Sequence, residues 1–219
     1  MGLSRKYQTA RGAQVDTQPG SHGRVLRNLL QITRKREMDR MEYESLLRVQ
    51  DTYLHRITPD TPFTVKLINA MHHDWLGHIY EWAGEYRTVE MEKDGFQWPP
   101  AYLIEQNMRA FQQAQLDRCT PCKPAPLSVV AQDMAEVHGE LLLIHPYRDG
   151  NGRLARWLAD LMALQAHMPA PDYAFTGRGA KRQQKRYLHA VQQAYIGNYG
   201  FLADFFAEAI DRRIRRLRV

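Results

Sequence analysis

The sequence predicts an all-α protein with one small β-hairpin attached to its helices. Along most of the 219 residues, apolar side chains recur three and four positions apart, which is the period of amphipathic helices. Residues 88–98 instead alternate apolar and polar side chains on both sides of the turn residues Asp94-Gly95, which predicts a hairpin. Two strands cannot form a sheet core, so the helices must build the core.

The expected elements follow in chain order. Residues 1–22 are polar and lack an apolar period, so they predict a flexible N-terminal arm before one domain over residues 23–219. A helical pattern begins at Val25 and continues to Leu54. A second helix is expected to begin at Thr61-Pro62, where a capping hydroxyl precedes a proline that has no N–H group to satisfy. Further helices are expected over residues 100–116, 128–144, 152–167, 178–196 and 198–216, with loops over 119–126 and 145–151.

Composition restricts the class of protein. The 44% hydrophobic and 25% charged residues are typical of a globular chain, and no apolar run reaches the length of a membrane span. The start of the chain lacks the apolar core of a signal peptide, so a cytoplasmic location is expected. Cys119 and Cys122 are too few for a disulfide framework, and no second pair of zinc ligands accompanies them.

The net charge of +6 comes from the two ends of the chain. Residues 1–36 carry eight basic and one acidic side chain, and the last nine residues carry five arginines and one aspartate. Residues 37–210 carry 17 basic and 22 acidic side chains. A nucleic-acid-binding module concentrates its basic residues on the fold itself, so nucleic acid is not expected to be the main partner.

The most informative stretch is His-Pro-Tyr-Arg-Asp-Gly-Asn-Gly-Arg-Leu-Ala-Arg at residues 145–156. Its two glycines allow the backbone to approach a ligand closely where a helix begins, and the N–H groups of a helix N-terminus bind anions. Arg153 and Arg156 are three positions apart, so both can reach one anion from the same helix face. Asp149 could hold the Mg²⁺ that accompanies nucleotide phosphates, and His145 titrates near neutral pH as a general base must. The stretch therefore predicts a site for a nucleotide or another phosphate.

A metal site is the main alternative within the sequence. His72, His73, Asp74 and His78 resemble the His and Asp pairs of HD-type metal phosphohydrolases. That assignment needs a further His and Asp on separate helices, and the sequence does not identify them.

The stretch at residues 145–156 resembles the signature of the Fic family, HxFx(D/E)GNGRxxR, with Tyr147 in place of the usual Phe. Tyr-Glu-Trp-Ala-Gly-Glu-Tyr-Arg-Thr at residues 80–88 resembles the family's WAG…R segment, and the likeness extends over residues 19–205. The resemblance implies a Fic-domain helical bundle whose hairpin is a flap. A target segment is expected to add a strand along its edge, at Thr88, Val89, Glu90, Met91 and Glu92.

The resemblance also implies a protein adenylyltransferase, which transfers AMP from ATP to a Ser, Thr or Tyr hydroxyl of a target protein with Mg²⁺ as cofactor. The roles in the family's motif fall on His145 as the base, Asp149 as the Mg²⁺ ligand, Gly150, Asn151 and Gly152 as the phosphate cradle, and Arg153 and Arg156 as the arginines for the β- and γ-phosphates. A catalytically idle nucleotide-binding adaptor and an HD-type hydrolase remain the alternatives.

Regulation is the point at which the chain departs from the family pattern. Many members are inhibited by a helix with the motif (S/T)xxxE(G/N), and the nearest match, Thr33 to Met38, has Met in the last place. Glu37 is the candidate inhibitory residue of that match. No Ser or Thr follows Thr176, so a C-terminal version is absent from the sequence. A small antitoxin-like chain that supplies the glutamate is the expected partner of a bacterial toxin, and an unregulated enzyme is the other possibility. Secretion as an effector is also open.

Overall fold

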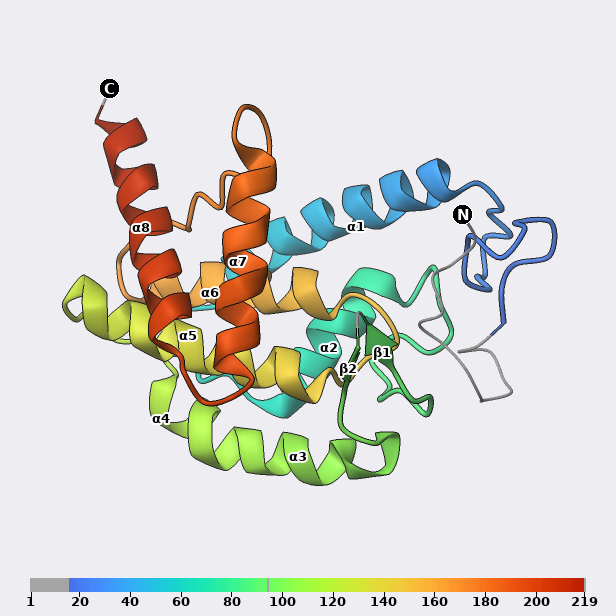
Figure 1. Ribbon diagram of the computed structural model, residues 1–219, viewed down its shortest axis with the longest axis horizontal. Helices are drawn as coiled ribbons and strands as arrows, with labels where there is room; N and C mark the ends of the chain where they lie inside the picture. Colours follow the sequence, from blue (N-terminus) through green and yellow to red (C-terminus); the bar gives the residue numbers. More distant parts are fainter. Residues whose placement is uncertain (1–15, 94, 219) are drawn as a thin grey trace. The chain divides into compact units, whose positions relative to one another are not determined.

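The computed structural model describes residues 16–93 and 95–218, and it confirms the predicted all-α class with a hairpin (Figure 1). Over these residues the only sheet is one antiparallel pair of strands. The chain divides into two compact units, each built from separate stretches. The first takes the described residues of Met1–Arg56, Val65–Arg109 and Ile144–Leu154, and the second takes Ile57–Thr64, Ala110–Leu143 and the described part of Ala155–Val219.

In the first unit, α1 (Lys35–Arg56) packs against α2 (Val65–Leu76). The Ser45 hydroxyl donates to the carbonyl of Trp75 at 2.7 Å, and the Trp75 indole N–H donates to the carbonyl of Glu42 at 2.9 Å. Tyr53 donates to the Asp74 carboxylate at 2.8 Å. These hydrogen bonds, of which the two to Trp75 are buried, fix the rotation of α1 about its axis in addition to the apolar packing.

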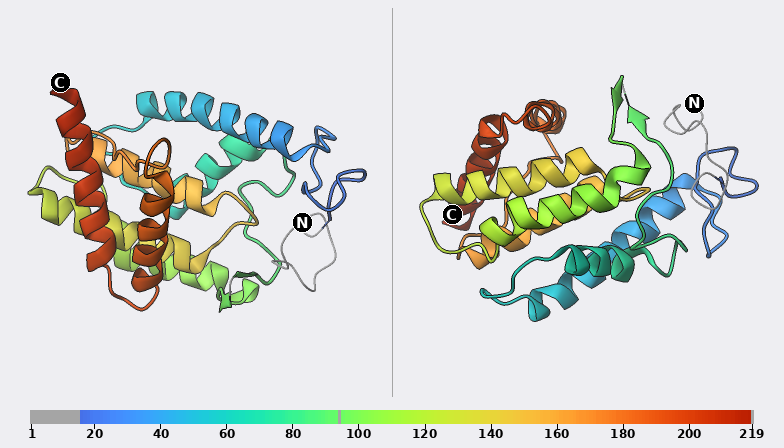
Figure 2. Two further views of the ribbon diagram at one scale, coloured as in Figure 1. Left: turned by 45° about the horizontal axis from the view of Figure 1, so that its top comes forward. Right: turned by 90° about the horizontal axis from the view of Figure 1, so that it is seen from below.

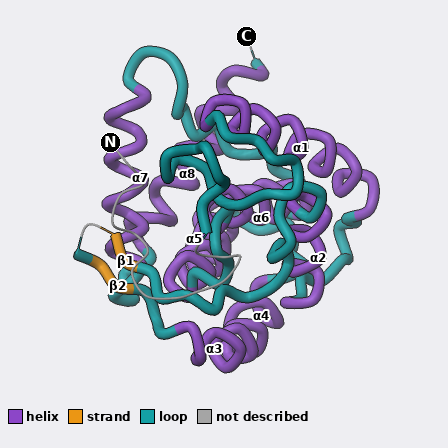
Figure 3. The backbone as a smooth tube through the Cα atoms, turned by 90° about the vertical axis from the view of Figure 1, so that its right-hand side faces the viewer, coloured by secondary structure: helices purple, strands orange, loops and turns teal. Residues whose placement is uncertain are grey.

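The segment in front of α1 is irregular, and the prediction of a helix from Val25 is wrong (Figure 3). Val25 and Ile32 are buried, as their apolar character predicts, but the chain between them follows the hydrogen bonds of Asn28. The Asn28 amide donates to the carbonyls of Leu26 and Ile32 at 3.0 Å, and its oxygen accepts the Ile32 N–H at 2.9 Å. An Asn side chain that bonds nearby backbone groups competes with helix formation.

The predicted N-terminal arm is described only in part, because residues 1–15 lie outside the described residues. Residues 16–22 form a turn against the next segment rather than a loose chain. Thr17 and Leu26 form an isolated antiparallel bridge, and Ser21 is fully buried.

The helix after α1 begins at Val65, not at Thr61-Pro62 as predicted. The Phe63 side chain is buried, and its N–H donates to the Thr120 hydroxyl at 2.9 Å. The Thr61 hydroxyl accepts the N–H of Thr58, so it caps a turn before the helix. The chain therefore becomes helical only at Val65.

The hairpin consists of β1 (Glu92–Lys93) and β2 (Phe96–Gln97), with Glu92 opposite Gln97. It is shorter than the predicted strands, although the Trp98 N–H donates to the Met91 carbonyl at 3.0 Å beyond the paired residues. The predicted alternation is present, because Val89 and Met91 are buried with Trp98 while Thr88 and Glu92 are exposed. The chain then enters the turn η1 (Ala101–Leu103) and the helix α3 (Ile104–Phe111).

The second unit holds the remaining helices, close to their predicted positions. The short π-helix η2 (Gln112–Leu116) and α4 (Asp117–Cys119) continue α3, and α5 (Leu127–Ile144) begins directly after Pro126. The start of α5 therefore lies one residue before the predicted start at residue 128. The unit is completed by α6 (Asn151–Gln165), whose first residues belong to the first unit, by α7 (Ala180–Ala194) and by α8 (Gly200–Leu217). In Figures 1 and 2, α7 and α8 lie side by side.

The arginines at the end of α8 contact the segment between α6 and α7. Arg212 donates to the carbonyl of Asp172 at 3.1 Å, and Arg216 pairs with the Asp172 carboxylate at 2.6 Å. Arg213 donates to the Ala170 carbonyl at 3.4 Å. Three of the basic residues at this end therefore have a structural role. Among the described helices, none combines the length and the apolar character needed to cross a membrane.

Candidate nucleotide site at the start of α6

The loop between α5 and α6 contains the predicted motif, and its backbone requires glycine at one position. Gly150 has a φ of +85°, which L-residues with side chains rarely adopt. A Cβ atom at Gly150 would lie 2.9 Å from the Trp75 ring and 3.2 Å from Nε2 of His72. The backbone of the loop therefore lies directly against these two side chains of α2.

Asn151 holds the loop in shape. Its side chain is buried, its oxygen accepts the N–H of Tyr147 at 3.0 Å, and its amide donates to the carbonyl of Tyr147 at 2.7 Å. The carbonyl of Gly150 accepts the N–H groups of Arg153 and Leu154, which makes Gly150 the last residue before the helix. The N–H groups of Asn151 and Gly152 precede the intrahelical hydrogen bonds of α6, and N–H groups at this position of a helix can bind an anion.

Tyr147, which replaces the family's usual Phe, is fully buried. Its ring stacks on His72 with the centroids 3.9 Å apart and the planes 9° apart. Its hydroxyl donates to the side-chain oxygen of Asn69, so the additional polar group is satisfied. The substitution is therefore accommodated by the packing of α2.

His72 has a structural role, which argues against the HD-type metal site. Its Nδ1 accepts the N–H of Gly84 at 2.8 Å, so the proton is on Nε2, which donates to the carbonyl of Asp149 at 3.0 Å. Burial lowers the pKa of His72 to about 4. Both ring nitrogens are therefore used by the protein, and Asp74 is hydrogen bonded to Tyr53.

Among the described residues, no set of His, Cys, Asp or Glu side chains gathers around the cysteines to hold a metal ion. Both are buried and unpaired with each other, and burial raises the pKa of Cys119 to about 12 and that of Cys122 to about 11. Without a metal ion both thiols therefore stay protonated at neutral pH, so neither is a reactive thiolate.

Arg153 projects from the first turn of α6 into a set of partners from three segments. Its guanidinium forms an ion pair with Glu42 of α1 and lies over the Trp75 ring, with the central carbon 4.6 Å from the ring centroid. A second nitrogen is 3.5 Å from the Asp149 carboxylate. Burial opposes its charge, but the carboxylates of Glu42 and Asp149 keep the pKa of Arg153 above its ordinary value.

Asp149 presents a half-exposed carboxylate at the same end of α6. One oxygen accepts the N–H of Gly150 at 2.6 Å, which sets its direction. Over the described residues, no three His, Cys, Asp or Glu side chains gather around a metal position. A single carboxylate fits Mg²⁺, because this ion keeps several waters and takes its other ligands from substrate phosphates.

His145 lies at the end of α5 with a φ of +53° and a half-buried side chain. Its ring packs against Trp98 of the hairpin at 4.1 Å between centroids. Its carbonyl accepts a hydrogen bond from Nε of Arg87 at 2.8 Å. The candidate base is therefore positioned by the hairpin and by the segment that leads into it.

Arg87 joins the hairpin to the motif loop. Its side chain is buried and donates to the carbonyls of Val89 at 2.7 Å and Pro99 at 2.6 Å, one at each end of the hairpin. Its backbone N–H donates to the carbonyl of Pro146 at 2.8 Å. The sequence motif WAG…R contains this arginine, but the motif alone does not reveal its partners.

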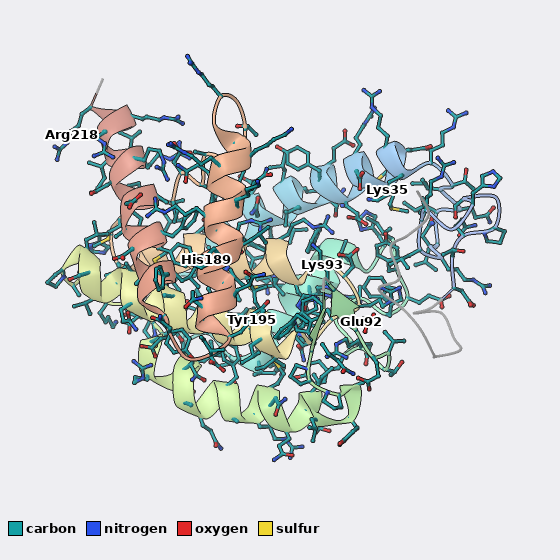
Figure 4. The ribbon with its side chains drawn as sticks, viewed as in Figure 1. Lys35, Glu92, Lys93, His189, Tyr195 and Arg218 are labelled. Atoms are coloured by element: carbon teal, nitrogen blue, oxygen red, sulfur yellow. The ribbon has the colours of Figure 1, made fainter. Side chains whose placement is uncertain are left out.

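The five residues predicted for target docking divide into two groups. Thr88 and Glu92 are exposed, whereas Val89 and Met91 are part of the small core under the hairpin. The Glu90 carboxylate accepts the N–H of Ala101 at 3.0 Å, at the start of η1. In Figure 4 the side chains of Glu92 and Lys93 are labelled on β1, the strand whose edge is the docking candidate.

Arg156 belongs to the second unit and lies one turn after Arg153 on α6. Its guanidinium carbon is 5.7 Å from the ring centroid of Phe175 and 5.9 Å from that of Tyr187. Nearby, burial raises the pKa of Asp160 to about 7, and its carboxyl accepts a hydrogen bond from Tyr173 at 2.8 Å.

Of the glutamates of α1, Glu37 is the one predicted from the sequence to act in regulation, and it is exposed in the first turn. Glu42 was not predicted as a site residue, but it is buried and pairs with Arg153. The signal was present, because Glu42 lies four positions after Met38 and seven before Val49, on the apolar face of the helix. A glutamate at such a position must have a partner.

Comparison with known proteins agrees with the motif. Residues 62–163 match the model of the Fic/DOC family. The chain is 26% identical over 215 residues to "Protein adenylyltransferase VbhT" of Bartonella schoenbuchensis, which covers 98% of this chain and 41% of that relative. It is 29% identical over 190 residues to "Probable protein adenylyltransferase y4lH" of Sinorhizobium fredii, which covers 84% of this chain and 90% of the relative.

Solved structures have the same fold. The N-terminal FIC domain of Bep8 from Bartonella sp. 1-1C aligns with a TM-score of 0.72 at 17% identity, over 90% of this chain and 95% of that one. The BepC protein of Bartonella tribocorum, solved with bound AMPPNP, aligns with a TM-score of 0.67 at 20% identity, over 84% and 91% of the two chains. With its signature at the start of α6 and its hairpin beside His145, this chain is similar to the Fic/DOC family over residues 62–163 and has the Fic-domain fold.

Proposed function

We propose that this protein is a protein adenylyltransferase that transfers AMP from ATP to the hydroxyl of a Ser, Thr or Tyr residue in a target protein. The observation that carries the proposal is the turn at Gly150. It places the N-terminus of α6, the Arg153 guanidinium and the Asp149 carboxylate together, a few residues after His145. The names of the relatives from Bartonella and Sinorhizobium support the same activity.

The residues divide the chemistry between them. His145 takes the proton of the target hydroxyl, whose oxygen then attacks the α-phosphorus of ATP while the bond to the β-phosphate breaks and pyrophosphate leaves. The N–H groups of Asn151 and Gly152 and the guanidinium of Arg153 stabilise the charge of the phosphates, and Arg156 holds the γ-phosphate. Asp149 would hold Mg²⁺, which neutralises phosphate charge when bound.

The target is proposed to bind through its backbone at the edge of the hairpin. Thr88 and Glu92 are exposed along this edge, and Arg87 ties the hairpin to the loop of His145. A strand added there would be held close to the proposed base, because Trp98 of the same hairpin packs on the His145 ring.

Labelled ATP tests the proposal directly. The protein is incubated with Mg²⁺, a bacterial lysate and ATP labelled at the α- or the γ-phosphate. We expect label on protein from the α-position alone, and a loss of about 10² to 10⁴ in rate in His145→Ala because the general base is removed. The matched control is His189→Ala, which removes an exposed histidine of α7 (Figure 4) and should keep full activity. Label from the γ-position means a kinase, free phosphate without protein label means a hydrolase, and ATP binding without any reaction means an adaptor.

For regulation, we infer that the protein acts as the toxin of a bacterial toxin-antitoxin pair, with a small partner that supplies an inhibitory glutamate. The sequence of the described C-terminal helices contains no Ser or Thr with which to build the inhibitory motif within the chain. Glu37 is the candidate within the chain, at the exposed start of α1. The proposed site of action is the cytoplasm of the producing bacterium, with delivery into another cell as the alternative.

A further inference from the structure

A buried carboxylate of α1 contacts the arginine that is proposed to bind the nucleotide. The side chain of Glu42 is 5% exposed, and one of its oxygens pairs with Arg153 of α6. The other oxygen accepts the hydroxyl hydrogen of Tyr80 at 2.6 Å. A carboxylate this far from water is costly unless both oxygens are satisfied, so the arrangement is a built contact and not a surface ion pair.

Glu42 also fixes the surface on which Arg153 lies. Its backbone carbonyl accepts the indole N–H of Trp75 at 2.9 Å, and the Arg153 guanidinium lies over that same indole ring. One residue therefore holds both an edge of the guanidinium and the aromatic plane beneath it. A long arginine side chain otherwise samples many rotamers, and ordering it when a ligand binds weakens affinity.

The contact leaves Arg153 able to bind an anion. A guanidinium has five N–H groups, and the ion pair with Glu42 engages only one of its nitrogens. The Arg153 side chain is 30% exposed at the N-terminal end of α6, beside the half-exposed Asp149. Glu42 therefore holds one terminal nitrogen of Arg153, while the other lies 3.5 Å from the Asp149 carboxylate at the partly exposed N-terminal end of α6.

We propose that Glu42 is a positioning residue that orients Arg153 for the phosphates of the nucleotide. The inference rests on the proposed function, since it assigns Glu42 a part in the same site. A competing assignment is inhibition, in which Glu42 occupies Arg153 and keeps the phosphates away. The two assignments predict opposite effects when the charge of Glu42 is removed, because orientation predicts weaker nucleotide binding and inhibition predicts tighter binding.

Calorimetric binding of ADP and AMP in the presence of Mg²⁺ separates these cases. ADP carries the β-phosphate that Arg153 is proposed to bind, whereas AMP lacks it. For Glu42→Gln we expect about tenfold weaker ADP binding, with AMP binding within about twofold of the wild type. The matched control is Glu44→Gln, which removes an exposed glutamate on the same helix that pairs with Arg40, and it should change neither affinity.

The outcomes distinguish the inference from the proposed function. If the wild type binds neither nucleotide, the proposed function fails. If the wild type binds ADP and Glu42→Gln binds it equally well or more tightly, the positioning role is overturned. An equal loss for ADP and AMP also overturns it, because a general defect in the fold would not distinguish the β-phosphate.

Two further variants keep the test decisive. In an Arg153→Gln background, Glu42→Gln should cause no additional loss in the ratio of ADP to AMP affinity, because the residue through which it acts is gone. If Glu42→Gln fails to fold in a thermal melt, Tyr80→Phe takes its place. It removes the hydroxyl that holds Glu42 but keeps the charge pair, so we expect a loss of about threefold for ADP alone. A folded Tyr80→Phe protein with unchanged ADP binding would refute the positioning role.

Discussion

At the scale of single residues, the motif is set by backbone geometry as much as by its charged groups. Gly150 combines a φ of +85° with a close approach to Trp75 and His72. The oxygen and the amide of the Asn151 side chain both form hydrogen bonds with the backbone of Tyr147. The sequence allowed the prediction that glycine lets the backbone approach something closely. It did not allow the prediction that the neighbour is α2, because that contact joins residues far apart in the chain.

Replacing Gly150 tests this geometry, and the chain offers a matched control. Gly177 has a φ of +74°, but a Cβ atom there would meet nothing within 4 Å. We expect Gly177→Ala to lower the free energy of unfolding by about 1 kcal/mol, the cost of the left-handed backbone alone. Gly150→Ala should lower it by about 3 kcal/mol, because the new methyl group also collides with Trp75. Chemical denaturation of both variants measures the difference, and equal losses would mean that the loop moves to accept the methyl group.

The partners of Glu42 could not be predicted from the sequence. Its partners Arg153 and Tyr80 lie far from it in the chain, and no local pattern places them together. Its position on the apolar face of α1 was visible in the sequence, but that position indicates only a buried partner of opposite charge and not which one.

At the scale of elements, helices with a strong apolar period were predicted to within a few residues, including α7 and α8. Errors arose where side chains bind backbone groups. Asn28 replaces the helix predicted after Val25 with a set of local hydrogen bonds. The Thr120 hydroxyl accepts the N–H of Phe63, so α2 begins later than predicted. The hairpin was predicted from its alternation, but its short pairing was not, because alternation reports burial and not hydrogen bonding.

Replacing Arg87 tests the link between the hairpin and the motif loop. In Arg87→Lys the positive charge remains, but an ammonium group cannot reproduce the separate hydrogen bonds to the carbonyls of His145, Val89 and Pro99. We expect kcat/KM for the target protein to fall by about tenfold or more, because both the docking edge and the loop of the base become less ordered. Nucleotide affinity should stay within about threefold, since Arg153 and Gly150 are untouched.

Steady-state kinetics with varied target, together with calorimetry for the nucleotide, checks this expectation. Arg109→Lys serves as the control, because Arg109 is exposed on α3 and pairs with Glu105. A parallel loss of nucleotide binding and target turnover in Arg87→Lys would contradict a specific role in the hairpin.

At the scale of the whole molecule, the division into two compact units could not be derived from the sequence, because each unit combines distant segments. Each unit also contains a buried histidine that stays neutral. Burial lowers the pKa of His72 to about 4 and that of His138 to about 3. Such groups make the protein less stable in acid, since the unfolded chain binds protons from about pH 6.5 downward and the folded chain does not.

The effect of Asp160 on stability has the opposite pH dependence to that of the two buried histidines. Its pKa is raised by burial to about 7, so the folded protein keeps a proton that the unfolded chain has lost above pH 4. The contribution of Asp160 to the free energy of unfolding therefore falls as the pH rises from 4 to 7, by up to about 4 kcal/mol. Over pH 4 to 6.5 the two buried histidines raise that free energy as the pH rises. In the wild type we expect stability to rise to a maximum near pH 6.5 and then to decline slightly. In Asp160→Asn the rise should be steeper and the decline should vanish, which urea unfolding at intervals from pH 4.5 to 8 will measure. If the two profiles run parallel, the Asp160 carboxyl is ionised in the folded protein and its charge is balanced by the arginines that lower its pKa, Arg156 and Arg213.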